Sequence, residues 1–161
     1  MGSLNIPEYD TAEWQTLRDE FILGWVQDAN ALQFIKIIGD TAELWDDLID
    51  QDKPISKNDV NRVFMNLTTV LPLNPFFDAY KLQLTPIMIA GINAWHDATA
   101  LERGSDNDKA IAYVLRDWYV ELLMYVVYLT RGYDAMRSIS VEARKFFGQH
   151  ETLEEYREKL S

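Results

Sequence analysis

Cysteine is absent from this sequence, which rules out disulfides and thiolate chemistry. Cysteine usage therefore does not indicate whether the protein works in an oxidising or a reducing compartment. Histidine occurs only at His96 and His150, so a Ser–His–Asp arrangement would depend on one of these two, and nothing around either favours it. There is also no Gly-rich phosphate loop, no Gly-x-Ser-x-Gly elbow and no His-Glu-x-x-His. The common signatures of nucleotide binding, ester hydrolysis and zinc proteolysis are therefore missing.

Basic residues are few. The chain has 15 Lys and Arg against 26 Asp and Glu, which gives a formal net charge of −11. Such a chain repels free nucleic acid and anionic membrane surfaces. We therefore expect a protein partner of basic character or a cation, and neither a nucleic-acid nor a membrane partner.

Signals for β-structure and for modular organisation are also missing. No alternating apolar run is bounded by hairpin turns, and no internal repeat or long linker interrupts the chain. With 161 residues and 48% hydrophobic content, the chain can build one sizeable core. We expect an all-α single domain over residues 1–161, with residues 1–10 as an irregular arm. The segment MGSLNIPEYD lacks the apolar run of a signal peptide, so a cytoplasmic location is expected.

The segment Ala110 to Leu129 is the most apolar part of the chain, and at helical pitch its apolar residues fall on every side. It predicts a central helix over about 107–131, with Trp118 and Leu122 in the core. Asp117 and Glu121 lie in the middle of this segment, where a bilayer would penalise a carboxylate by at least about 2.5 kcal/mol. A membrane span is therefore not expected here.

The remaining helices follow from caps, breakers and apolar spacing. We predict an irregular bundle of seven to eight helices around the central one. The central helix is expected to follow a cap at Ser105 or Asp106. The other helices are expected to begin near Thr11, after Asp28, and at Ser56, Asn74, Pro86, Ser140 and Thr152. The second is expected to reach Asp50 through Gly39, although a new start at Asp40 is an alternative. The core face expected for the third comprises Val60, Val63, Phe64, Leu67 and Leu71.

Asp46, Asp47 and Asp50 form a local Asp-Asp-Leu-Ile-Asp sequence that resembles the DDxxD box of isoprenyl diphosphate synthases. In that family the box holds Mg²⁺ ions that grip a diphosphate, which suits the preference of Mg²⁺ for carboxylate and phosphate oxygens. No second box is present, and the acids fall opposite the apolar stripe of their helix. The simpler alternative is that these acids form a solvated surface of the helix and bind no ligand. Glu43-x-x-Asp46 also matches half of the pattern of all-α nucleotide pyrophosphatases, but the spacing of Asp117 and Glu121 does not supply the other half.

A second acidic set lies on the two helices that should pack beside each other. Asp117 and Glu121 are four residues apart on the central helix, and Asn93 and Asp97 have the same spacing on the preceding helix, with His96 beside them. Carboxylates and histidine on facing helices build metal sites in helical bundles. The simpler alternative is a structural role, in which Asp117 or Glu121 pairs with an arginine such as Arg62, Arg103 or Arg131, because buried charges need partners.

Four segments, LWDDLIDQDKPIS, VLPLNPFFDAY, INAWHDATALERG and YVLRDWYVELL, resemble in this order segments of small helical tailed-bacteriophage proteins of unassigned function. The resemblance covers about residues 40–130. It implies a viral or prophage origin, with residence in the host cytoplasm or the virion, and it carries no catalytic residue.

The sequence thus predicts an acidic helical protein that binds another macromolecule without catalysis and without a cofactor, and that can form homo-oligomers. The alternative is a Mg²⁺-dependent enzyme that acts on a phosphorylated or diphosphate small molecule through its helix-borne carboxylates. The position of Asp46, Asp47 and Asp50 helps to separate the two, since an enzyme would place them around a cleft and a binding protein on an open face.

Overall fold

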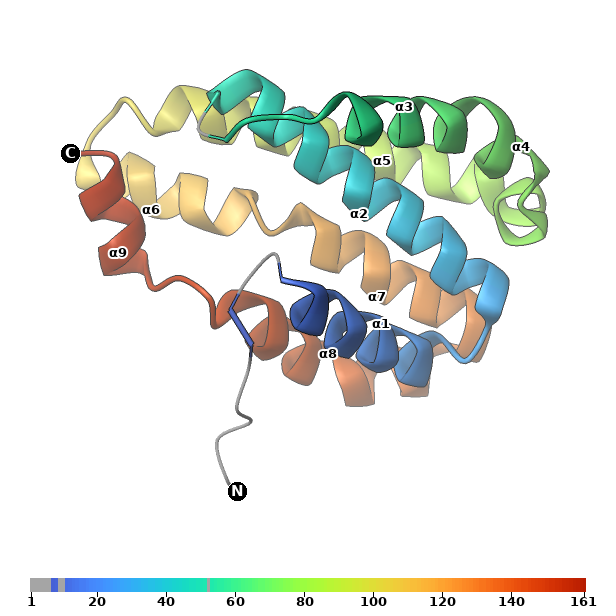
Figure 1. Cartoon of the computed structure of the whole chain (residues 1–161). Coiled ribbons are helices and arrows are strands. Elements are labelled where there is room, and N and C mark those ends of the chain that lie inside the picture. The colour runs from blue at the N-terminus through green and yellow to red at the C-terminus, as the bar shows by residue number, and fades with distance from the viewer. Residues whose placement is uncertain (1–6, 9–10, 52) are drawn as a thin grey trace.

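The computed structural model describes residues 7–8, 11–51 and 53–161, and these residues form helices and no strand (Figure 1). The predicted all-α class is confirmed. In chain order the elements are α1 (Ala12–Val26), α2 (Ala29–Asp50), α3 (Lys57–Met65), the π-helical turn η1 (Asn66–Val70), α4 (Leu71–Leu73), α5 (Pro75–Leu101), α6 (Asp106–Leu115), α7 (Trp118–Arg131), α8 (Tyr133–Gly148) and α9 (Leu153–Lys159). The expected arm of residues 1–10 lies, apart from Pro7 and Glu8, outside the described residues.

Helix α7 occupies the centre of the bundle and packs against α1, α2, α5 and α8. Figure 1 shows α3, α4 and α5 on one side of the molecule, α1 and α8 on the other, and α2 and α7 between them. Helix α6 packs against α5 and α9 at one end. Among the described residues, no helix combines the length and the apolar character that crossing a bilayer requires.

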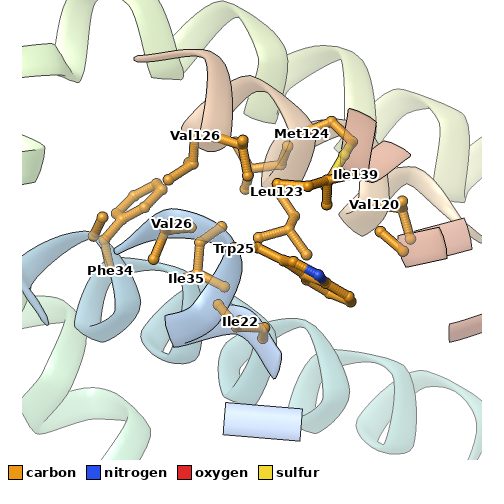
Figure 2. Close-up of a cluster of buried hydrophobic side chains, with 14 of the residues drawn as sticks. Ile22, Trp25, Val26, Phe34, Ile35, Val120, Leu123, Met124, Val126 and Ile139 are labelled. Atoms are coloured by element: carbon orange, nitrogen blue, oxygen red, sulfur yellow. The ribbon is translucent and has the colours of Figure 1, made fainter. Parts of the chain in front are cut away.

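The core forms where α1, α2, α7 and α8 meet. Figure 2 shows Ile22 and Val26 of α1 facing Phe34 of α2 and Leu123 and Val126 of α7. Leu122 is fully buried, as predicted, whereas Trp118 is only half-buried and packs against the core from its edge. Fully burying a side chain of this size contributes about 1.5–3 kcal/mol, so each of these core residues stabilises the packing of the four helices.

Most helix starts follow the predicted side-chain caps. The Thr11, Asp28 and Ser56 side chains accept hydrogen bonds from backbone N–H groups of the first helical turn. Ser105 and Thr152 each form a reciprocal capping box with the acidic residue three positions later. Helix α2 runs unbroken through Gly39 to Asp50, so a new helix start at Asp40 is wrong.

The central segment is not one helix. It breaks at Arg116 and Asp117, where the Asp117 N–H donates to the Val114 carbonyl at 3.2 Å and the Val120 N–H donates to the Asp117 carbonyl at 3.1 Å. These tight turns redirect the chain, and Figure 1 shows the non-helical stretch between α6 and α7. The helix predicted over about 107–131 is therefore two helices, and the expected count of seven to eight differs slightly from what the structure has.

Two glycines receive the aromatic side chains that open α7. A Cβ on Gly91 of α5 would lie 2.2 Å from Cε3 of Trp118, and a Cβ on Gly39 of α2 would lie 3.0 Å from the Tyr119 hydroxyl oxygen. Tyr119 also donates a hydrogen bond of 3.1 Å to the Ile35 carbonyl. The start of α7 is thus wedged between α2 and α5 at points where those helices have no side chain.

Two predicted helix starts are wrong. Pro86 lies inside α5, which continues from Pro75 to Leu101. Proline removes one intrahelical donor, but Pro86 and Leu82, four residues before it, are both exposed, so water can satisfy the Leu82 carbonyl. Ser140 lies inside α8, where its buried hydroxyl accepts a hydrogen bond of 3.3 Å from Arg137 instead of capping a helix.

Candidate functional site

Asp46 connects three parts of the fold. Its Oδ1 accepts a hydrogen bond from the Trp95 indole N–H of α5 at 2.8 Å and another from Nη1 of Arg116, at the α6–α7 break, also at 2.8 Å. Asp46 is thus still partly solvated, with its side chain 41% exposed, but it also bonds to two other parts of the fold, which the sequence did not predict. A helix wheel shows which residues lie away from the main apolar stripe, but it does not show that a tryptophan and an arginine from elsewhere in the chain reach that side.

Arg116 is the centre of this polar cluster. Its Nε donates to a carboxylate oxygen of Glu102 at 2.5 Å, and the same oxygen accepts a short hydrogen bond from the Tyr156 hydroxyl of α9. Its guanidinium carbon lies 5.2 Å from the centre of the Trp95 ring, which is a cation–π geometry. Asp46, Trp95, Glu102, Arg116 and Tyr156 are called the Arg116 cluster below.

The pKa shifts in the Arg116 cluster reflect this pairing. Burial opposes the charge of Arg116, but the hydrogen bond and the charge of Glu102 outweigh burial and raise its pKa. Burial also opposes the charge of Glu102, while the hydrogen bonds from Arg116 and Tyr156 lower its pKa below the ordinary value. The pKa of Tyr156 is raised, by burial first and by its bond to Glu102 second. The cluster therefore carries ionised Glu102 and Arg116 with their hydrogen bonds satisfied.

Asp47 and Asp50 diverge from each other. Asp50 lies 4.0 Å from Nη2 of Arg116, on the side of Asp46, whereas Asp47 lies 3.7 Å from the Lys53 ammonium group. Asp46 and Asp47 line two different cavities. The three aspartates of the DDxxD-like sequence are thus distributed over two sides of α2 and do not surround one cleft.

The second predicted acidic set is spread along the bundle. The Asn93 amide donates to Asp97 at 3.0 Å on an exposed face of α5, and His96 is exposed beside the Trp45 ring. Glu121 is exposed and pairs with Arg144 at 2.7 Å, so it does bind an arginine, but not one of the three expected. Among the described residues, no three Asp, Glu or His side chains form a group that could hold a metal ion. A Mg²⁺ site remains a prediction from the sequence.

Asp117 is half-buried and differs from the paired charges of the Arg116 cluster. It sits at the break before α7, makes no capping hydrogen bond, and forms no ion pair within the described chain. Burial raises its pKa above the ordinary value; Arg144 acts against this shift and Glu121 adds to it. The expected pairing of Asp117 or Glu121 with an arginine is thus found at Glu121 and not at Asp117.

A polar cavity of about 430 Å³ opens between α1, α2 and α3. On its wall, the buried Arg18 pairs with Asp19 at 3.2 Å and lies 3.8 Å from Asp40. Burial raises the pKa of Asp40 although the charge of Arg18 opposes this shift. Lys36 also pairs with Asp19. The wall is built from carboxylate–cation pairs, so no single sign of charge dominates it.

An aromatic cavity of about 250 Å³ lies at the α6–α7 break. Aromatic side chains from four helices line it together with charged groups, and the lining comprises Trp14, Arg18, Gly39, Ala42, Glu43, Asp46, Trp95, Arg116, Asp117, Trp118, Tyr119, Val120 and Phe147. The unpaired Asp117 carboxylate is part of this wall. An aromatic pocket with a few polar groups and a carboxyl of raised pKa has the character of a ligand site.

Helix α3 leaves much of its predicted core face in water. Val63 and Leu71 are buried as expected, but Val60, Phe64 and Leu67 are 43%, 69% and 38% exposed. The prediction of a five-residue core face is thus wrong for three of its members: α3 packs on α2, where Val63 is buried, while among the described residues these three side chains remain exposed. Val60 and Phe64 of α3 and Leu67 of the following turn η1, spaced i, i+4 and i+7, are called the α3 stripe below.

The sequence did not predict that most residues of the Arg116 cluster would come together. Arg116 is the one cation in the apolar segment Ala110 to Leu129, and that position was the only signal, since a charge inside such a helix needs a partner.

A search with family models found no match to the chain, and comparisons with curated proteins and with solved structures found none either.

Proposed function

We propose that this protein binds a partner protein without catalysis and that the α3 stripe receives a basic amphipathic helix of that partner. The observation that carries the proposal is Phe64, a large aromatic side chain that is 69% exposed in the middle of a well-formed helical run. Clustered exposed apolar side chains on a soluble protein commonly mark a binding surface. Aromatic residues are also the usual anchors of protein interfaces.

The spacing of the α3 stripe suits a helical partner. Residues at i, i+4 and i+7 line one side of a helix, which is the pattern by which amphipathic helices recognise one another. Leu73 of α4 and Leu82 and Ile89 of α5 are also exposed apolar side chains.

The charge of the chain favours a basic partner. At a net charge of −11 the protein attracts cationic proteins at long range and repels a second copy of itself. Positive residues around the apolar face of a partner helix would use this attraction. The resemblance to tailed-phage proteins predicts such a partner among virion or host proteins.

The test uses a synthetic amphipathic helical peptide with a leucine face and lysines on its polar face. A second peptide has the same apolar face with glutamates in place of the lysines. Fluorescence anisotropy should show binding of the lysine peptide, weakened by salt, and little binding of the glutamate peptide. Phe64→Asp should abolish binding, whereas Val141→Asp on α8, an equally charged change at a residue that is 58% exposed, should not.

Two outcomes would overturn the proposal. One is equal binding of the lysine peptide to wild type and Phe64→Asp. The other is a dimer in sedimentation velocity that Phe64→Asp dissociates, because the α3 stripe would then be occupied by a second copy of the chain.

A further inference from the structure

In the aromatic cavity at the α6–α7 break, the cationic side chains form ion pairs, but the carboxylate of Asp117 does not. Arg18 on its wall pairs with Asp19, and Arg116 pairs with Glu102 and Asp46. The Asp117 carboxylate on the same wall has neither a hydrogen bond nor an ion pair among the described residues. The cations of the cavity thus form ion pairs with protein carboxylates, whereas the charge of Arg144 acts on Asp117 without forming an ion pair with it.

Aromatic side chains stand next to this carboxylate. Trp118 and Tyr119 follow Asp117 directly, both line the cavity, and both are half-buried, which leaves part of each side chain accessible. Trp118 packs closely against Gly91 and Tyr119 against Gly39, which limits how far the two side chains can move. The faces of aromatic rings attract cations, and Arg116 above Trp95 shows this interaction in the wall of the same cavity.

We propose that this cavity binds a small organic cation of the quaternary ammonium class, with Asp117 as its counter-charge and Trp118 and Tyr119 as its aromatic walls. An alkylated ammonium ion is weakly hydrated and donates no hydrogen bonds, so a wall of aromatic surface and one carboxylate suits it better than it suits a metal ion. A volume of about 250 Å³ accommodates a head group of this size.

The electrostatics of the cavity favour a cation over an anion. The start of α7 and two arginines would attract an anion, but both arginines already have carboxylate partners. Glu43 and Asp46 line the cavity in addition to Asp117. Burial raises the pKa of Asp117 although the charge of Arg144 opposes this shift, and a bound cation would place a further positive charge beside the partly desolvated carboxylate.

Choline and its neutral isostere 3,3-dimethylbutan-1-ol separate charge from shape. Titration of the purified full chain at neutral pH, followed by tryptophan fluorescence and by calorimetry, should show saturable binding of choline. The alcohol should bind at least about tenfold more weakly, because it fills the same space without the charge.

Two matched variants assign the binding to Asp117. Asp117→Asn should weaken choline binding by about tenfold or more while keeping the fold, since it removes a desolvated charge at constant shape. Glu121→Gln removes the same charge one turn along α7, from an exposed residue that does not line the cavity, and should leave binding unchanged. The proposal is overturned if choline does not bind, if the alcohol binds equally well, or if Asp117→Asn binds choline as tightly as wild type does.

Discussion

Arg116 and Asp46, separated by 70 positions in the sequence, are joined by a hydrogen-bonded ion pair of 2.8 Å. Asp46 comes from the last turns of α2, and Arg116 from the break that divides the central segment into α6 and α7. The side chain of Arg116 is only 20% exposed, and Glu102 holds it from the other side. The break in the central helix and the acidic end of α2 are therefore parts of one arrangement.

Replacing Arg116 should lower the stability of the folded protein. Arg116→Met keeps much of the volume but leaves Glu102 and Asp46 partly buried without their cation. We expect the free energy of unfolding in urea to fall by about 2 kcal/mol, less than for a fully buried pair because water still reaches the cluster. Arg144→Met provides the control, since its pair with Glu121 is exposed and should contribute less than about 1 kcal/mol. Equal losses for both variants would show that the Arg116 cluster has no special structural role.

Gly91 should be intolerant of a side chain. Gly91→Ala would place a Cβ 2.2 Å from Trp118 Cε3, so Trp118 and the start of α7 must shift, at an expected cost of about 1–3 kcal/mol. Gly24→Ala is the matched control within α1, because a Cβ there meets nothing within 4 Å. It should stabilise the protein by about 0.5–1 kcal/mol through the higher helix propensity of alanine. A destabilising Gly24→Ala, or a neutral Gly91→Ala, in urea denaturation would contradict this account of the wedge.

Local signals predicted the parts of the fold that local chemistry decides. The capping boxes at Ser105 and Thr152 need only residues three positions apart, and both helices begin where the sequence places them. The all-apolar character of the central segment also predicted its central position correctly, although not its continuity. The break at Arg116 depends on Glu102, Asp46 and two glycines on other helices, and no window along the segment itself contains that information.

The candidate sites were less predictable for the same reason. Apolar spacing on α3 shows that one face is hydrophobic, but it does not show whether another helix of this chain covers that face. Phe64 and Val63 carry the same apolar signal, yet one is exposed and the other is buried. The aromatic cavity is assembled from α1, α2, α5, α7 and α8, so its residues are scattered over the sequence and share no motif.

Glu102 should make stability depend on pH in mildly acidic solution. Its folded-state pKa lies below the ordinary value of 4.5, although burial opposes this, because Arg116 and Tyr156 donate hydrogen bonds to its carboxylate. A lowered folded-state pKa contributes stability that is fully present above the unfolded-state pKa and is lost as the pH falls through the folded-state pKa. Urea denaturation between neutral pH and pH about 3 should therefore show a smaller acid-induced loss for Glu102→Gln than for wild type. Asp40 and Asp117, whose pKa values are raised, act in the opposite direction in both proteins and cancel in this comparison. Parallel curves would mean that Glu102 is not ionised through its pair with Arg116.

Mg²⁺ should leave the melting temperature unchanged if the acidic residues of α2 are structural. A ligand that binds only the folded state raises the melting temperature by an amount that grows with the logarithm of its concentration divided by its Kd. Asp46 already bonds to Arg116 and Trp95, and Asp47 faces Lys53, so neither carboxylate needs a metal ion for its charge. Asp46→Asn should cost about 1 kcal/mol because it weakens two bonds of the Arg116 cluster, while Asp47→Asn should stay within about 0.5 kcal/mol. A Mg²⁺-dependent rise in melting temperature that Asp47→Asn abolishes would instead favour the enzyme that acts on a phosphorylated substrate and overturn the non-catalytic proposal.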